Sequence, residues 1–98
     1  CPMGPYIVPD AFIEDPEKLA LRTSVNDRVM QDARTDDLTH GIADILAFLS
    51  RAITLLPGDV LTTGTPSGVG FARGIFLKPG DVVKTEIEKI GVLSNPVA

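Results

Sequence analysis

The pattern of apolar and polar residues predicts a chain built mostly from β-strands. Residues 19–26 alternate with a period of two, which is typical of a strand with one buried face. Asn26 and Asp27 follow, and these residue types adopt left-handed backbone conformations more readily than most. Because residues 28–32, "RVMQD", come next, the sequence predicts a β-hairpin over 19–32.

A second hairpin is predicted at the C-terminal end. Residues 82–88 alternate cleanly, with Val83, Thr85 and Ile87 on one side and charged residues on the other. Residues 92–97, "VLSNPV", follow after a short turn and form its second strand.

Pro-Gly turns precede two predicted strands, 57–63 ("PGDVLTT") and 79–85 ("PGDVVKT"). Proline fixes φ at one turn position and glycine allows a positive φ at the next. Asp59 and Asp81 follow the glycines, where an aspartate bonds nearby backbone amides and has a structural role. A further short strand is predicted at residues 6–8.

One segment, residues 36–56, has the period of an amphipathic helix. Its apolar stripe consists of Ile42, Ile45, Leu46, Leu49 and Ile53. Burial of each aliphatic side chain contributes about 1.5–3 kcal/mol, so we expect the sheet to cover this stripe. The candidates to cap the first turn are Asp36, Asp37 and Thr39. The predicted fold class is therefore α+β and β-rich, with one main helix packed on the sheet.

Composition and charge set limits on the class of protein. The 98 residues suffice for one small domain, and 44% hydrophobic with 22% charged residues is ordinary for a globular protein. A net charge of −4 without a basic stripe favours neither nucleic acid nor an anionic membrane. No apolar run approaches the roughly 20 residues of a membrane span. A single cysteine, Cys1, indicates a reducing compartment, and we expect the cytoplasm. The chain lacks an initial methionine, so we expect it to be part of a longer protein.

The loop "TTGTPSGVG" (62–70) is the main candidate for a ligand site. It lacks the lysine of a P-loop, the following helix of a dinucleotide fingerprint and the flanking glycines of a nucleophile elbow. Pro66 restricts Thr65 to an extended conformation, and Gly64 lets a ligand approach the backbone closely. A ligand loop and a purely structural turn both remain open, and the residues alone favour the turn.

The other chemically active side chains are each better explained without catalysis. His40 lies in a polar segment, where a solvent-facing side chain is expected. Cys1 has no histidine nearby in sequence, and the chain lacks the ligand pattern of a zinc site. The aspartates of "DARTDD" could bind a hard cation, but capping and solvation are the commoner roles. These aspartates are Asp32, Asp36 and Asp37.

Several segments together resemble the C-terminal half of the fumarylacetoacetate hydrolase family. They are "PMGPYIV", "VNDRVMQD", "PGDVLTTGTPSGVG", "LKPGDVV" and "IEKIGVLSNPV", which extend over nearly all 98 residues. The resemblance implies a mixed β-roll and homodimers that act on 2-oxo acids or related β-diketo acids. Members hydrolyse C–C bonds, decarboxylate or isomerise, and the isomerase/decarboxylase branch of aromatic-compound catabolism fits best. A Mg²⁺ or Mn²⁺ ion bound by the 2-oxo acid would stabilise the enolate that forms.

The resemblance also carries site residues to this chain. The threonine of "TGTP" lines the family's pocket and bonds substrate, which here is Thr65, with Gly64 giving access. Gly4 and Pro5 of "PMGP" are expected near the pocket rim. The family's metal ligands and catalytic lysine lie upstream, in motifs that this sequence lacks. The chain is therefore expected to supply substrate-binding residues to one catalytic domain whose N-terminal portion is absent, and to be inactive alone.

The competing hypothesis is a non-catalytic, β-rich association module, in which the glycine loop is only a turn. The two hypotheses differ in whether metal and a 2-oxo acid analogue stabilise the complete protein.

Overall fold

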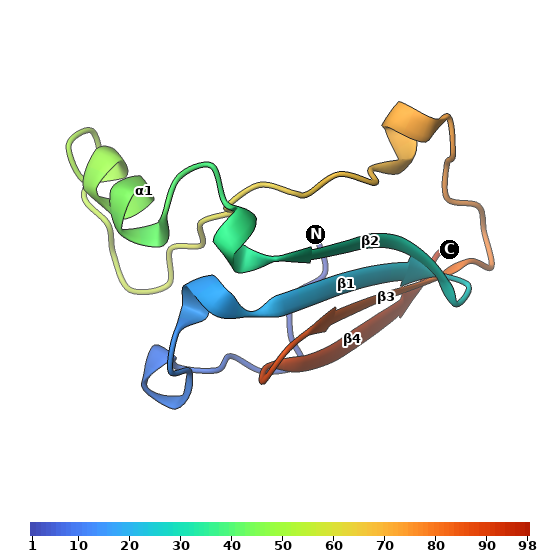
Figure 1. The fold of residues 1–98 in the computed structure, drawn as a ribbon, viewed down its shortest axis with the longest axis horizontal. Helices are drawn as coiled ribbons and strands as arrows, with labels where there is room; N and C mark the ends of the chain where they lie inside the picture. The colour runs from blue at the N-terminus through green and yellow to red at the C-terminus, as the bar shows by residue number, and fades with distance from the viewer.

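The computed structural model describes residues 1–98 as an α+β fold with a four-stranded antiparallel sheet and one α-helix (Figure 1). The strands are β1 (Ala20–Val25), β2 (Arg28–Arg34), β3 (Val82–Ile87) and β4 (Gly91–Pro96), in the order β2-β1-β3-β4. The helix α1 spans Ile42–Leu49. Four 3-10 helices lie in the connections: η1 (Asp10–Phe12), η2 (Pro16–Lys18), η3 (Thr35–Asp37) and η4 (Gly70–Arg73). The α+β, β-rich class predicted from the sequence is confirmed.

Both predicted hairpins form. Asn26 and Asp27 connect β1 to β2 with φ angles of 50° and 65°, the left-handed conformation that a two-residue hairpin turn requires. β3 and β4 form the C-terminal hairpin. On β3, Val83, Thr85 and Ile87 are half-buried while the residues between them are exposed, so the predicted alternation is confirmed.

One face of the sheet carries a row of four half-buried residues, one from each strand. The row consists of Gln31, Thr23, Thr85 and Leu93. Next to it, β2 contains one extra residue, because Thr23 pairs with Gln31 whereas Ser24 pairs with Val29. Met30 is therefore a β-bulge, a feature that bends a strand and changes the direction of nearby side chains.

The helix is shorter than the 21 residues predicted for 36–56, because it begins only at Ile42 and already ends at Leu49. Gly41 is extended (φ −64°, ψ 158°) and precedes the first turn without a capping side chain of its own. The carboxylate of Glu17, 25 residues earlier, accepts a hydrogen bond from the Ile42 amide (2.6 Å) and serves as the cap. The predicted caps are therefore wrong, since none of them bonds the first turn: Asp36, Asp37 and Thr39.

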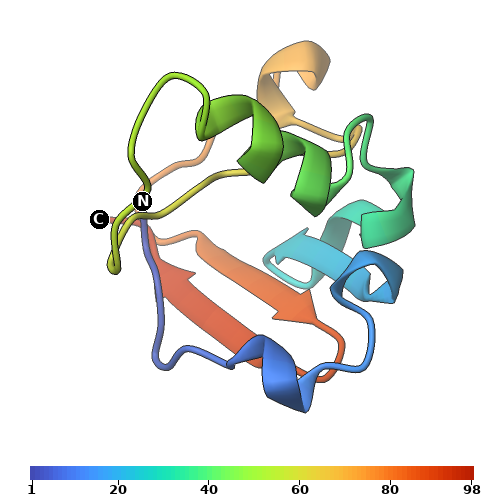
Figure 2. The same cartoon turned by 90° about the vertical axis from the view of Figure 1, so that its left-hand side faces the viewer.

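The apolar stripe of α1 is not covered by the sheet. Figure 1 shows α1 beyond one end of the strands, and Figure 2 views the molecule from that end. No residue of the helix is buried, and Leu46 is 40% exposed; Ile53, predicted to belong to the stripe, lies beyond the end of α1 and is 51% exposed. The expectation that the sheet covers all five aliphatic side chains is wrong for these 98 residues. α1 is also the longest helix, and no helix meets the length and hydropathy of a bilayer span.

Two short predicted strands, 6–8 and 57–63, do not form. The Pro-Gly turns are present, and Asp59 and Asp81 each accept a hydrogen bond at 2.8 Å from the amide three residues earlier, as expected. After the first turn, the chain runs alongside the edge strand β2 (Figure 1) but adds no backbone ladder to it. Without a hydrogen-bonding partner, residues 60–63 do not form a strand.

Asp81 joins the first hairpin to β3. Its carboxylate accepts bonds from the Lys78 amide (2.8 Å) and the Asn26 side chain (2.7 Å). Asn26 also accepts a bond from the Val82 amide (2.9 Å). These bonds, that of Lys78 foremost, hold the pKa of Asp81 below its usual value of 3.8. The ionised side chain therefore stabilises the fold at neutral pH, and this contribution is lost as the pH falls through the lowered pKa.

The 98 residues do not enclose a core of their own. They expose 7633 Å², whereas a compact monomer of 10.4 kDa exposes roughly 5,400 Å². Only Ile13, Leu19 and Ser24 are buried. The radius of gyration, 15.0 Å, also exceeds the roughly 12.6 Å expected of a compact domain of this length. Much apolar surface therefore remains available for contact with other protein.

Candidate functional site

The glycine loop lies against the bulge in β2. Gly68 has a φ of +106°, and a Cβ built there would overlap the carbonyl oxygen of Met30 and lie 3.1 Å from Cγ of Gln31. Only glycine combines this backbone conformation with so close an approach. Gly68 therefore sets the position of the loop on the sheet.

Gln31 bonds the same loop through its side chain. Its Nε2 donates to the hydroxyl of Thr65 (2.8 Å) and to the carbonyl oxygen of Pro66 (2.9 Å). A carbonyl oxygen only accepts, so the amide must present its NH₂ group to the loop. Both NH₂ hydrogens are then used, and the Thr65 oxygen is the acceptor of one of them.

The predicted contact residues, Thr65 and Gly64, are both exposed. Gly64 has a φ of +101°, and no atom lies within 4 Å of a Cβ built on it, so the backbone there is open to approach. The Thr65 hydroxyl donates no hydrogen bond within the chain, and its oxygen is bonded only by Gln31. An unused donor in an accessible position is free to bind a ligand.

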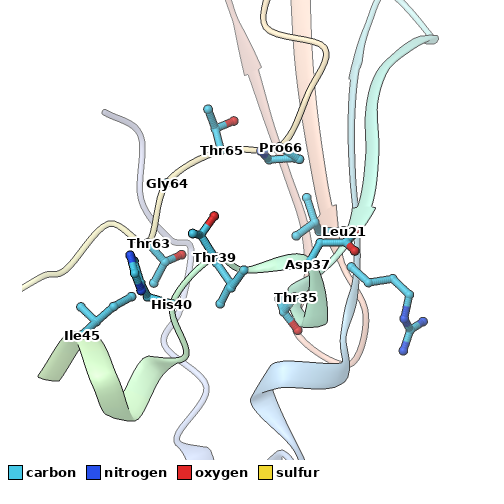
Figure 3. Close-up of a pocket in the computed structure, with 12 residues that line it drawn as sticks. Leu21, Thr35, Asp37, Thr39, His40, Ile45, Thr63, Gly64, Thr65 and Pro66 are labelled. Carbon is cyan, nitrogen blue, oxygen red and sulfur yellow. The ribbon is translucent and has the colours of Figure 1, made fainter. Parts of the chain in front are cut away.

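Two cavities meet at Thr65. The first, about 240 Å³, separates residues 63–66 from the segment 35–40 that leads into α1. Figure 3 shows Thr39, His40 and Thr63 around it, with the Thr65 side chain pointing away from them. The second, about 300 Å³, lies between the glycine loop and the face of the sheet. Its lining includes Thr65, Gln31, Thr23, Val83, Val69 and Phe76.

The remaining candidates do not assemble into a catalytic or metal centre. His40 is exposed, as expected, and contributes only to the wall of the first cavity. Cys1 is exposed as well. Asp32 forms an ion pair with Arg22 (2.9 Å), and Asp36 lies 3.5 Å from Arg34.

No three side chains of His, Cys, Asp or Glu lie where they could hold a metal ion. Residues 1–98 therefore do not fit the divalent cation that the resemblance implies. Any such ion in the complete protein would need ligands from elsewhere.

Gly4 and Pro5 line a different cavity from Thr65. They border a third cavity, about 260 Å³, against the β3–β4 hairpin. Tyr6 anchors this segment by donating to the carbonyl oxygen of Ile90 (2.8 Å). The expectation that Gly4 and Pro5 lie at the rim of the same pocket is not supported within these residues, since neither lines a cavity at Thr65.

Sequence reasoning missed Gln31 and Gly68 as contributors to the site. Gln31 entered only as part of the motif "VNDRVMQD", and Gly68 only as one of several loop glycines. A signal for Gln31 was present, because it alternates with Val29 and Ala33 and is therefore a polar residue at an apolar position of a period-two pattern.

Comparisons with known proteins identify the family. Residues 1–98 match the family described as fumarylacetoacetate (FAA) hydrolase C-terminal. Oxaloacetate tautomerase fahd2, mitochondrial, of Xenopus laevis is 44% identical over 99 residues, which cover 99% of this chain and 31% of that protein.

Two solved structures show the same fold. 2-Hydroxyhepta-2,4-diene-1,7-dioate isomerase from Mycobacterium marinum is 47% identical with a TM-score of 0.85, over 97% of this chain and 34% of that one. Maleylpyruvate hydrolase from Sphingobium sp. SYK-6, in complex with manganese(II) ion and pyruvate, is 36% identical with a TM-score of 0.90, over 97% and 34% of the two chains. The present chain thus spans about a third of the length of these relatives. It belongs to the fumarylacetoacetate hydrolase family.

Proposed function

We propose that residues 1–98 form the C-terminal part of a single catalytic domain that acts on 2-oxo acids. In this proposal Thr65 and Gly64 contact the substrate, and the reaction is C–C bond hydrolysis, decarboxylation or isomerisation. The observation that carries it is the exposed Thr65 hydroxyl, which is held by Gln31 and has its own hydrogen unused. The manganese–pyruvate complex of a relative with the same fold supports a small 2-oxo acid as the ligand class.

The surface of the chain supports a larger domain. The exposed area exceeds that of a compact monomer by roughly 2,200 Å², well above the roughly 800 Å² that each partner buries in a standard interface. A continuous stretch of further protein accounts for this excess better than a dimer contact alone.

The cofactor belongs to the same proposal. We infer that the complete protein binds Mg²⁺ or Mn²⁺ through ligands outside residues 1–98. The ion would supply a Lewis acid for the 2-oxo carboxylate, whereas Thr65 would orient a substrate oxygen. The homodimer implied by the family resemblance and the cytoplasmic location expected from the single cysteine remain predictions, and the tautomerase relative is named as mitochondrial.

The alternative function, a non-catalytic association module, is favoured by one observation. Large apolar side chains are exposed on several separate elements, as expected of a surface that binds other protein. The clearest examples are Phe12, Phe48 and Phe71, which are 76%, 71% and 81% exposed.

The replacement Thr65→Val in the complete protein separates the two functions. Valine keeps the shape of the side chain but removes the hydroxyl, so we expect pyruvate affinity in a Mn²⁺ buffer to fall about 2- to 13-fold, the effect of one hydrogen bond. Isothermal titration measures this change. The matched control is Thr62→Val, since Thr62 is exposed in the same loop and lines neither cavity at Thr65. Equal affinity in both variants would remove Thr65 from the ligand site.

A further inference from the structure

We propose that Gln31 is a positioning residue that fixes the Thr65 hydroxyl as a hydrogen-bond donor, so that the ligand atom at this point must be an acceptor oxygen. This inference rests on the proposed function and deepens it. It assigns the chemistry of one ligand atom, a carboxylate or keto oxygen, and names the residue that enforces this choice.

The hydrogen-bond polarity follows from the Pro66 carbonyl. Because that oxygen can only accept, Gln31 must direct its NH₂ group toward the loop, and its two hydrogens go to Pro66 and Thr65. The Thr65 oxygen therefore accepts from Gln31, and its own hydrogen must point away from the amide. With no acceptor for that hydrogen inside the chain, it is directed at whatever occupies the adjoining space.

The backbone around Gln31 holds this arrangement in place. The bulge at Met30 lies next to Gln31 in β2, and Gly68 brings the loop onto the same two residues. Gln31 itself is half-buried in the row that continues with Thr23 and Thr85, so its amide is restrained from turning into solvent. A positioned donor loses less conformational freedom on binding than a hydroxyl that can rotate.

A donor at Thr65 discriminates between ligands. A carboxylate has only acceptor oxygens, whereas a primary amide in the same place can present an NH₂ group that faces the Thr65 hydrogen unfavourably. The complete protein should therefore prefer pyruvate over pyruvamide. Part of that preference should depend on Gln31.

The test is a double-mutant cycle in the complete protein, with titration of pyruvate and pyruvamide in a Mn²⁺ buffer. Gln31→Met keeps the length of the side chain but removes both donors, so we expect pyruvate affinity to fall about 2- to 13-fold. In the Thr65→Val background, the same replacement should have a smaller effect, because only the bond from Gln31 to the Pro66 carbonyl is left to lose. Gln31→Met should also narrow the preference for pyruvate over pyruvamide.

A second pair of variants separates positioning from folding. Gln31→Glu is nearly isosteric but has no hydrogen to donate at neutral pH, so the Thr65 hydroxyl turns toward it and pyruvate binding weakens. Glu86→Gln makes the reverse change on the opposite, exposed face of the sheet and should leave both affinities unchanged.

Each outcome supports or overturns a specific claim. If Thr65→Val leaves pyruvate affinity unchanged, the proposed function fails. If Thr65→Val weakens binding but Gln31→Met costs the same factor with and without the Thr65 hydroxyl, the proposed function stands and the role of Gln31 is overturned. The role of Gln31 would also be overturned if Gln31→Met and Gln31→Glu preferred pyruvate over pyruvamide as strongly as the unmodified protein does.

Discussion

Replacement of Gly68 by alanine is expected to disrupt the loop and the ligand site together. The added Cβ overlaps the Met30 carbonyl oxygen, and the φ of +106° is one that alanine rarely adopts. Backbone strain of about 1–3 kcal/mol and overpacking of about 1–3 kcal/mol should lower the free energy of unfolding by about 2–6 kcal/mol. The loop must move off β2, so the Gln31–Thr65 bond is lost and pyruvate affinity should fall about tenfold or more.

Gly58→Ala is the matched control for this prediction. Gly58 has a similar φ, +98°, but no atom lies within 4 Å of a Cβ built on it. Gly58→Ala should lower the free energy of unfolding only by the backbone strain of about 1–3 kcal/mol, and the variant should keep its affinity for pyruvate. Chemical denaturation measures the free energy of unfolding of both variants, and titration measures their affinity for pyruvate. If Gly68→Ala behaves like Gly58→Ala in both measurements, the contact between the loop and β2 does not position the site.

Truncation of Leu19 is expected to have the largest effect among the apolar side chains. Leu19 is only 4% exposed, the least of any residue in the chain, and it precedes β1. Its amide donates to the Thr35 hydroxyl (2.9 Å), and its carbonyl accepts from the Thr35 amide (2.9 Å). Leu19→Ala leaves a cavity where β1 meets the segment after β2. The free energy of unfolding should therefore fall by about 2–5 kcal/mol.

Leu19→Met serves as the control, because it keeps the side-chain volume and should cost less than about 1.5 kcal/mol. Denaturant titrations of the complete protein with both variants measure the difference. Equal effects of the two replacements would mean that Leu19 is not a packing centre. Because Thr35 also lines the cavity of about 240 Å³, the alanine variant tests whether this packing supports the wall of the site.

The hairpins were predictable because their signals are local. Asn26 and Asp27 tolerate the left-handed conformations of a two-residue turn, and the strands on both sides alternate in polarity. The Pro-Gly-Asp turns are local too, since each aspartate bonds an amide three residues away. Such features need no information about the rest of the fold.

The errors concern segments whose structure depends on distant residues. The strand predicted at 57–63 has suitable residues but finds no ladder partner, because the edge strand β2 hydrogen-bonds the returning chain through the Gln31 side chain and not through its backbone. The helix starts at Ile42 because Glu17 supplies its cap from another part of the chain. Periodicity cannot reveal either contact.

The candidate site was predictable in part. The resemblance to the family singled out Thr65 and Gly64, and the structure places both in an accessible loop. It could not indicate how Thr65 is held, because that depends on a bulge at Met30 and on the close approach of Gly68 to the strand. Nor could it indicate that the Thr65 hydroxyl accepts from Gln31 and has its own hydrogen free to donate. That follows from the Pro66 carbonyl, which accepts a bond from the same Gln31 amide.

A crystal structure of the complete protein with Mn²⁺ and pyruvate would show whether the Thr65 hydroxyl binds the 2-oxo acid. We expect a pyruvate oxygen within about 3.2 Å of the Thr65 hydroxyl oxygen, with the Gln31 amide still bonded to its other side. A structure in which pyruvate lies beyond about 4 Å from that hydroxyl, or in which the rest of the protein covers Thr65, would contradict it.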